Sequence, residues 1–564
     1  VSYFAAWQNH RCPAVNTKIS MVKWVWKKLT SPLANTLTQT PDPLRYKKYH
    51  EISGEDNKGD GQGGVSYFAA ICLAVNLLMG SGFLALPALV YKSGLILGPL
   101  VLVVGAFLMK ICVTYEAEAM CRAEAITHYR LNPREYAAEV RRGGGGGGGG
   151  RPAFALKRRA FSVLEMCELF GGRPLRNAYA LFYCASLLTS LVGYATVFAT
   201  SMSSWLPIPW VNGGQGCSLE SELYGMSSGC NELYIIYTAL FALIVVPISL
   251  HDIKEQVIFQ MIMTYLRFAL VIAMVGTTVY ASYTNAPIFG SDFQTLTVTE
   301  DSSAAAGAAG AGAAFATTAP LFDWTGTSQV LSAAVFSLTL NSYLPILVED
   351  MKPEDKRRLG GVVTWGTFLT CAFYVGIGTS VAYYFGGAVA ASCNVNWAGF
   401  RGGAATADAR PLWASALALF VVTFPTLDVL SVYPLNAVNI AKYLMALVYG
   451  ERIDKAETDR FIVRFFRLMV GLPPIAVALW ASNFTVVLVY AGITAIPMSM
   501  IVPPYLARLS RRAVREELRV GDAETPYSGW FSGDQTALGV AAVGVGMLVL
   551  CSWETTRELL KGDS

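Results

Sequence analysis

Long runs of apolar residues alternate with shorter polar segments over most of the chain. Each run approaches the roughly 20 residues that an α-helix needs to cross a hydrocarbon core of about 30 Å. Because such a core offers no water to unpaired backbone groups, we expect the runs to be helices. The pattern predicts an all-α membrane protein with about 11 transmembrane helices. The expected spans are Val65–Ala88, Ile96–Tyr115, Ala178–Ser204, Leu233–Leu250, Val257–Tyr280, Gly326–Val348, Gly361–Phe385, Leu412–Tyr433, Phe465–Trp480, Thr485–Leu506 and Gln535–Trp553.

The first span is interrupted by residues that disfavour a continuous helix. Its middle reads NLLMGSGFLALP (Asn76–Pro87), with two glycines, a serine and a proline. One interpretation is a face of small residues that lets helices pack closely. The other is an unwound helix whose free N–H groups and half-helix dipole hold an anionic group. We favour unwinding, because Asn76 lies one turn before the glycines and Pro87 follows within two turns.

A second interruption lies in the sixth span, which contains SLTLNSYLP (Ser337–Pro345). These polar residues are dense for the middle of a span, and Pro345 frees a carbonyl one turn earlier. A kink satisfied by serine and threonine side chains would also explain the segment. The first and sixth spans are corresponding members of two five-span halves, and an odd number of spans makes the second half inverted. Broken helices at matching places in inverted halves point to a transporter site.

Composition agrees with a membrane protein, because 54% of the residues are hydrophobic and only 15% are charged. The net charge of +4 gives no support for nucleic acid binding. Lysine and arginine gather in alternate connecting segments, whereas Leu206–Glu232 and Tyr283–Thr325 contain neither. By the positive-inside rule, we expect the N-terminus to be cytosolic. The basic segments hold Lys23, Lys27, Lys28, Arg45, Lys47, Lys48, Arg141, Arg142, Lys157, Arg158, Arg159, Lys352, Lys356, Arg357, Arg358, Arg452, Lys455, Arg460, Arg508, Arg511, Arg512 and Arg515.

The 11 cysteines and 4 histidines form no cluster with metal-ligand spacing. We therefore expect no metal site and no catalytic residue, and we expect that the protein is not an enzyme. Cys217 and Cys230 flank a loop rich in glycine and serine on the side opposite the basic segments. An oxidising compartment there would favour a disulfide between them, and two free thiols are the alternative.

Residues 1–64 are expected to be a cytosolic, disordered segment, and the repeat of Val1–Ala6 as Val65–Ala70 suggests a misassembled sequence. Residues 65–553 would form the transmembrane domain, and residues 554–564 a short C-terminal tail. Two low-complexity inserts, Gly143–Gly150 and Ala304–Ala314, are expected to be flexible.

Two charged residues stand well inside predicted spans, Arg267 in the fifth and Asp428 in the eighth. An isolated charge at that depth costs at least about 2.5 kcal/mol, so it is expected to have a function or a partner. The two residues either pair with each other or face an aqueous cavity separately.

The segment Asn76–Pro87 resembles the first-span signature of the amino acid/auxin permease family. Three further segments are similar to family motifs: Glu165–Gly172, Phe336–Pro345 with Glu349–Pro353, and Tyr433–Leu435. The resemblance covers Val65 to about Trp553. It implies a LeuT-like fold of five plus five inverted helices with one extra helix, and coupling to protons or sodium. Asn341 departs from the family, which frequently has histidine there, and the acid Asp428 is a second departure.

The resemblance and the two interruptions together suggest the residues of a binding site. The substrate carboxylate is expected at the N–H groups of Gly80, Ser81 and Gly82, and its ammonium group at Ser337, Thr339 and Asn341. The expected coupling-ion residues are Asn76, Met79 (through its carbonyl), Thr423 and Thr426, with Arg267 and Asp428 beside them. In the implied fold the first, fifth and eighth spans adjoin. Arg267 could then stand where sodium sits in related carriers, and Asp428 could carry a proton.

These features favour a secondary active transporter that moves amino acids by alternating access. No GxxxxGK[ST] motif is present, so an ion gradient, of protons or sodium, is the expected energy source and no cofactor is expected. A sensor that binds amino acids without substantial flux is the alternative. A channel is disfavoured, because no continuous polar stripe or ring of acids is visible. An acyltransferase would need an intramembrane histidine or cysteine nucleophile with a partner, and the positions of the four histidines, outside the apolar runs or at an edge of one, argue against it. The partners would be an amino acid and the bilayer of the plasma membrane or of a vacuolar or lysosomal membrane, and the oligomeric state is left open.

Overall fold

The computed structural model describes residues 65–143, 154, 156, 160–212, 217, 228–250, 257–284, 289, 320–404, 409–449, 456, 458–519 and 523–562. The expected disordered segment 1–64 and the insert Ala304–Ala314 lie outside these residues, as does the glycine run apart from Gly143.

The described residues form a helical bundle, and their only β-type pairings are two isolated bridges. The main helices are α3 (Tyr67–Leu78), α4 (Leu86–Ser93), α5 (Leu97–Leu131), α6 (Pro133–Gly143), α7 (Val163–Trp205), α9 (Ser228–Leu250), α10 (Val257–Thr284), α12 (Thr327–Ser337), α13 (Leu344–Asp350), α14 (Leu359–Phe385), α15 (Leu412–Tyr449), α17 (Arg460–Gly471), α18 (Pro473–Ala478), α19 (Phe484–Ile496), α20 (Val502–Glu517) and α21 (Asp534–Gly562). Short helical turns, η3 (Ser81–Leu84) and η5 (Asn341–Tyr343), lie between the halves of the interrupted spans.

Within the described part of the chain, 10 helical stretches are long and apolar enough to cross a membrane. The first predicted span is not one of them: it is split into α3, η3 and α4, and α3 is an apolar helix of only 12 residues. The prediction of an all-α membrane protein is therefore confirmed, and the chain is a multi-pass integral membrane protein.

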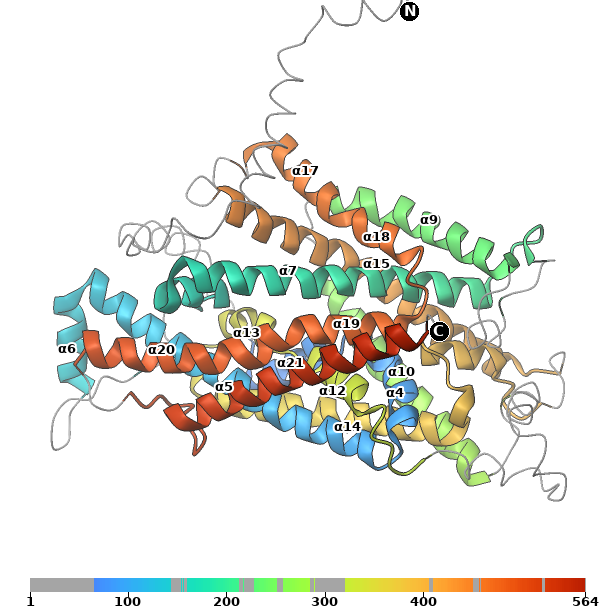
Figure 1. Ribbon diagram of the computed structural model, residues 1–564, viewed down its shortest axis with the longest axis horizontal. Helices are drawn as coiled ribbons and strands as arrows, with labels where there is room; N and C mark the ends of the chain where they lie inside the picture. Colours follow the sequence, from blue (N-terminus) through green and yellow to red (C-terminus); the bar gives the residue numbers. More distant parts are fainter. Residues whose placement is uncertain are drawn as a thin grey trace, which may run out of the picture.

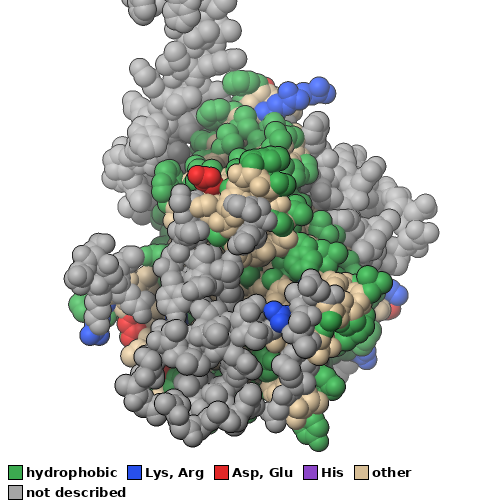
Figure 2. Space-filling model, turned by 90° about the vertical axis from the view of Figure 1, so that its right-hand side faces the viewer, with side chains coloured by type: hydrophobic (Ala, Val, Ile, Leu, Met, Phe, Trp, Pro, Cys, Tyr) green, Lys and Arg blue, Asp and Glu red, His purple; other side chains and the backbone are tan. Residues whose placement is uncertain are grey.

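The outer face of α5 shows how the sequence fits a lipid environment. Leu100, Val103, Val104 and Phe107 are about half exposed, at 48–52% of their surface. Their spacing of three and four residues places them on one face of the helix, whereas Leu102 is fully buried. In water such a contiguous apolar stripe would be unfavourable, but against lipid acyl chains it is not. Among the coloured residues at the end of the molecule drawn in Figure 2, hydrophobic side chains are common and charged side chains lie at isolated places.

The helices lie side by side along the long axis of the molecule (Figure 1). α7 packs against α15, α19 and α9, while α14 packs against α3, α4, α5 and α10. Small residues allow the closest approaches, as expected for membrane helices. A β-carbon on Gly492 of α19 would overlap the Ser332 carbonyl of α12, and one on Gly366 of α14 would lie 2.9 Å from the Ala74 β-carbon of α3.

Several helices are longer than their predicted spans, α7 and α5 among them. α7 begins at Val163 with a capping box formed by Ser162 and Glu165, and it is kinked at Gly172, whose φ of 70° suits glycine. Pro174 follows two residues later and prevents a regular turn there. The predicted span, which began at Ala178, is the part of α7 after this kink.

α5 continues past the predicted end at Tyr115, through a buried charged cluster. Glu118 accepts hydrogen bonds from Arg122 at 2.8 Å and from Arg511 of α20 at 3.3 Å. Arg511 also pairs with Asp534 at the start of α21, at 2.8 Å. The cluster ties α5, α20 and α21 together, and mutual pairing offsets the cost of burying charge. The final predicted span likewise continues, because α21 runs to Gly562 and includes most of the expected tail.

Candidate functional site

The backbone of the first interrupted span is exposed at Gly80, where the neighbouring space is open. α3 ends at Leu78, and the backbone is extended at Gly80, with φ −74° and ψ −172°. Gly80 is exposed, and a β-carbon built on it would have no heavy atom within 4 Å. The chain then forms η3 and enters α4, whose first turn contains Pro87. The helix is therefore broken where the sequence predicted, and the broken backbone borders an opening.

The second interruption lies against the first. α12 ends at Ser337, η5 follows, and α13 starts with Pro345 in its first turn. A β-carbon on Gly82 would overlap the Ser337 hydroxyl. The Tyr374 hydroxyl of α14 lies 2.8 Å from the Leu78 carbonyl and 3.2 Å from the Ser337 carbonyl, so it can donate to the last carbonyl of either broken helix. The two interruptions thus form one local structure, although Gly82 and Ser337 are 255 residues apart in the chain.

The predicted carboxylate site is assembled only in part. Gly80, Ser81 and Gly82 lie together, but the Gly80 N–H donates to the Leu78 carbonyl at 2.9 Å. That N–H already has a partner in this conformation, contrary to the expected role as a free donor. The short turn that closes on Leu78 is the physical reason, because it satisfies one of the donors that unwinding releases.

The three residues expected at the substrate ammonium group differ in their hydrogen-bond partners. The Ser337 hydroxyl is buried next to Gly82 and has no hydrogen-bond partner among the described residues. Thr339 donates to the Val335 carbonyl of its own helix. Asn341 is 1% exposed, and its Nδ2 donates to Glu116 Oε2 of α5 at 2.8 Å. Of these three side chains, only Ser337 lies in the described structure against a glycine of the first interruption.

Arg267 and Asp428 form a buried ion pair between α10 and α15. The Arg267 Nη2 lies 2.7 Å and 2.9 Å from the two Asp428 oxygens. Its Nη1 donates to the carbonyl and to Oδ1 of Asn76, both at 3.1 Å. The two charged residues are 6% and 4% exposed. The sequence left open whether Arg267 and Asp428 pair or face a cavity separately, and in the structure they pair. The Arg267 guanidinium also binds Asn76 of the first interrupted span.

The remaining coupling-ion candidates are close in sequence to this ion pair. Thr423 donates to the Leu419 carbonyl at 2.6 Å, and Thr426 donates to the Thr423 carbonyl at 2.5 Å. Met79 is buried at the non-helical end of α3, with ψ 69°. Because both Asn76 oxygens accept from Arg267, they are engaged by a protein cation in this structure. No group of three or more His, Cys, Asp or Glu side chains suited to a metal occurs in the described part of the chain.

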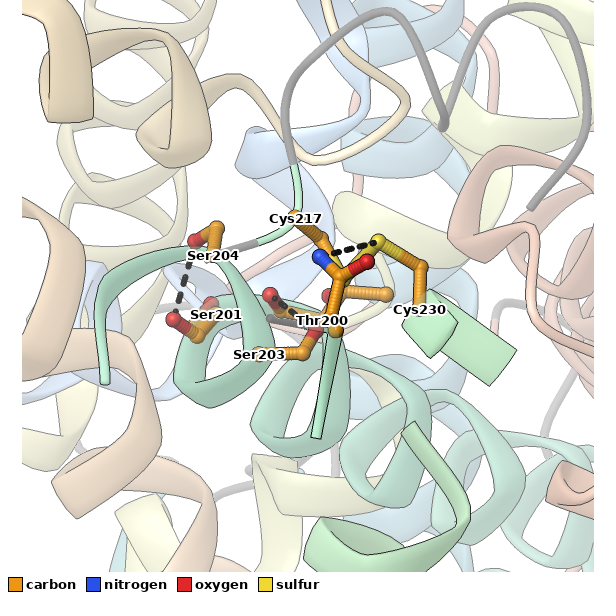
Figure 3. The surroundings of a disulfide bond; sticks show 7 residues. Thr200, Ser201, Ser203, Ser204, Cys217 and Cys230 are labelled. Atoms are coloured by element: carbon orange, nitrogen blue, oxygen red, sulfur yellow. Dashed lines mark hydrogen bonds between the residues drawn. A yellow bond between two sulfur atoms is a disulfide. The ribbon is translucent and has the colours of Figure 1, made fainter. Parts of the chain in front are cut away.

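Cys217 and Cys230 are joined by a disulfide at one end of the bundle, beside the end of α7 and the start of α9 (Figure 3). Their Cα atoms are 5.5 Å apart. The Cys217 N–H donates to the Ser203 carbonyl at 2.9 Å, so the crosslink is anchored to the last turn of α7. Cys393 is a free, buried thiol.

Glu116 and Tyr374 contact the two interruptions but were not among the residues expected from the sequence. Glu116 lies one residue beyond the predicted end of its span, and the charges that follow it made the segment resemble a helix end. The signal was present, because Glu118 and Arg122 are spaced by four residues, as ion pairs within a helix are. No sequence pattern singles out Tyr374, because a tyrosine in an apolar helix is usually an ordinary core residue.

No family model and no curated protein matches the chain. Among solved structures, crystal structures of a manganese transporter from Eremococcus coleocola are similar. One mutant of that transporter is 10% identical, with a TM-score of 0.40, over 93% of this chain and 98% of its own. The same transporter in complex with an aromatic bis-isothiourea substituted compound also has 10% identity and a TM-score of 0.40, over 94% of this chain and 99% of its own. Likeness at this level identifies neither a family nor a substrate.

Proposed function

We propose that the protein is a secondary active transporter that moves amino acids across a membrane by alternating access. The observation that carries the proposal is the contact between two interrupted helices beside an opening at Gly80. A broken backbone is tolerated in a membrane protein only where it is buried in protein or lines a cavity. Two such breaks from distant parts of the chain, packed together, are the arrangement by which transporters bind substrates near the midplane.

An amino acid suits this arrangement because it carries one negative and one positive group. The start of α4 gives the partial positive charge of a helix N-terminus near the first interruption, which favours a carboxylate. On the other side, the unpartnered Ser337 hydroxyl and the carbonyls that end α12 are acceptors for an ammonium group. The resemblance of Asn76–Pro87 to the amino acid/auxin permease family supports the same substrate class, and it supports the inverted five-plus-five repeat.

We further propose that protons, and not sodium, drive transport. The Arg267 guanidinium binds both oxygens of Asn76, which the sodium alternative would require as ligands. A sodium ion there would stand close to a fixed positive charge, and like charges repel strongly in a medium of low dielectric constant. Asp428, as the partner of Arg267, keeps this region electrically balanced.

The orientation follows from the charges of the connecting segments. With the basic segments in the cytosol, the disulfide between Cys217 and Cys230 lies on the opposite, oxidising side. Both the cell exterior and the lumen of a vacuole or lysosome fit this orientation.

Uptake of labelled amino acids into proteoliposomes tests the proposal. We expect accumulation under an inward proton gradient that persists when choline replaces sodium, with liposomes containing the Gly82→Val variant as the inactive control. Loss of uptake in choline that a proton gradient cannot restore would overturn proton coupling. Specific binding of amino acids without flux under either gradient would identify a sensor instead of a carrier.

A further inference from the structure

A fully buried carboxyl group lies beside the second interruption. Glu116 of α5 is 0% exposed, and its Oε2 accepts the hydrogen bond from Asn341 Nδ2 of η5 at 2.8 Å. Glu116 Oε1 has no hydrogen-bond partner in the described structure, and neither has Asn341 Oδ1. One acid and one amide are therefore joined by a single hydrogen bond, and each has one oxygen left over.

Among the residues that the structure describes, none places a compensating charge beside Glu116. The titratable groups that face it are Cys112 on its own helix, Cys167 and Tyr179 on α7, and Tyr443 on α15. None of these side chains carries a positive charge. No lysine, arginine or histidine of the described chain pairs with Glu116, which is the opposite of the situation at Asp428.

A proton on Glu116 would satisfy both leftover oxygens. As a carboxylate, Glu116 only accepts, so its Oε1 and the Asn341 Oδ1 are two acceptors without a donor. As a carboxylic acid, it gains an O–H that can donate to Asn341 Oδ1, while Asn341 Nδ2 continues to donate to Oε2. The result is a closed acid–amide pair with two hydrogen bonds and no net charge, which is the form that an apolar interior accommodates.

We propose that Glu116 is a proton-binding site that couples protonation to the conformation of the second interrupted helix. The proposal rests on the proposed function, and it names the group that the driving proton binds. The proton is taken up from water as Glu116 becomes neutral and pairs with Asn341, and it is returned to water when the pair opens. Loss of the proton would leave a buried carboxylate, so the ionised state favours a conformation in which η5 moves and water reaches the site. A ligand shifts such an equilibrium only by binding one state better, and here the proton binds the closed pair.

The Glu116→Gln variant tests the coupling, because glutamine imitates the protonated acid. Its amide can donate to Asn341 Oδ1 and accept from Asn341 Nδ2, but it cannot release a proton. In proteoliposomes we expect amino acid binding and exchange of internal for external substrate to stay within about twofold of the unmodified protein. Accumulation driven by a proton gradient is expected to fall at least about tenfold, and the pH dependence of exchange to flatten. The matched control is Glu165→Gln, because glutamine also fits a capping box, and it should keep full accumulation.

Two results would overturn the proposal. One is accumulation and pH dependence in Glu116→Gln equal to those of the unmodified protein. The other is loss of substrate binding in folded Glu116→Gln, which would make Glu116 part of the binding structure and not a proton site. If the unmodified protein accumulates no amino acid under any gradient, the proposed function fails first.

Infrared difference spectroscopy on the purified protein measures protonation without transport. We expect a pH-dependent C=O stretching band of a carboxylic acid that is present in the unmodified protein and in Glu165→Gln but absent from Glu116→Gln. The same band in all three proteins would overturn the assignment to Glu116, whatever the transport assays give.

Discussion

Two buried polar contacts tie the interrupted helices to their neighbours, and they differ in charge balance. At the first interruption, Arg267 and Asp428 neutralise each other and the guanidinium also binds Asn76. At the second interruption, the one hydrogen-bond partner of the Glu116 carboxyl group among the described residues is the amide of Asn341. A balanced pair stays intact as long as both partners are present, whereas an acid without a cation depends on its proton. The comparison suggests that one contact fixes the bundle and the other responds to conditions.

The largest expected effect comes from breaking the balanced pair. Arg267→Met leaves the Asp428 carboxylate buried without its cation, and removing one partner of a buried pair costs about 3–5 kcal/mol. We expect a large fall in folded protein, measured by thermal unfolding and size-exclusion chromatography in detergent. The double variant Arg267→Met with Asp428→Leu should recover most of the loss, because no charge is then left unpaired. A double variant as unstable as Arg267→Met would show that the pair does more than balance charge.

Substitutions at Glu116 test the contact with Asn341 at the second interruption. Glu116→Leu removes the acceptor of Asn341 Nδ2 and leaves a buried amide unsatisfied, at a cost of about 1–3 kcal/mol. Glu116→Gln restores the acceptor, so its thermal stability should lie within the equivalent of about 1 kcal/mol of the unmodified protein. Equal destabilisation by both variants would mean that the carboxylate charge itself stabilises the fold, and would contradict the difference drawn between the two contacts.

The two glycines of the first interruption differ in their surroundings, because Gly82 is packed against Ser337 and Gly80 faces open space. Gly80 and Gly82 were both expected at the substrate carboxylate, but of the two only Gly82 packs against a neighbouring side chain. Gly82→Val would push against Ser337, and overpacking of this kind costs about 1–3 kcal/mol. We expect substrate affinity to be lost in Gly82→Val and largely retained in Gly80→Ala, which has room for its methyl group. Binding of labelled substrate to purified, folded protein measures both, and equal affinities would place the binding site elsewhere.

Much of this architecture could be predicted, because the bilayer imposes strong rules on sequence. Every predicted span lies on one helix or on consecutive helices, and both interruptions lie at the predicted residues, since glycine, proline and clustered polar residues are costly inside a span. Arg267 and Asp428 could be singled out for the same reason. Their contact with each other could not be predicted, because it depends on how three helices pack.

Other parts of the site depend on tertiary structure to a greater degree. The sequence suggested that Asn341 would bind the substrate, but its hydrogen-bond partner is Glu116 of α5, which lies 225 residues earlier in the chain. The Gly80 N–H was expected to be free, but a tight local turn engages it. In both cases the sequence located the interrupted segment, but it did not give the hydrogen-bond partner, which depends on tertiary packing for Asn341 and on the local backbone conformation for the Gly80 N–H.

The smallest expected effect concerns the tyrosine that joins the two interruptions. The Tyr374 hydroxyl can donate to Leu78 or to Ser337, and each of those carbonyls ends a broken helix. Tyr374→Phe keeps the ring and removes this donor, so the expected loss is that of one hydrogen bond, about 0.5–1.5 kcal/mol. Because the donor links the two interrupted helices without charge, the loss should be independent of pH, unlike any change at Glu116. Thermal unfolding of Tyr374→Phe between acidic and neutral pH would measure it, with Tyr383→Phe on the exposed face of α14 as the matched control. A loss that varies with pH would mean that Tyr374 acts through a titrating neighbour, and the two interrupted helices would then belong to one proton-responsive unit instead of two contacts of different kinds.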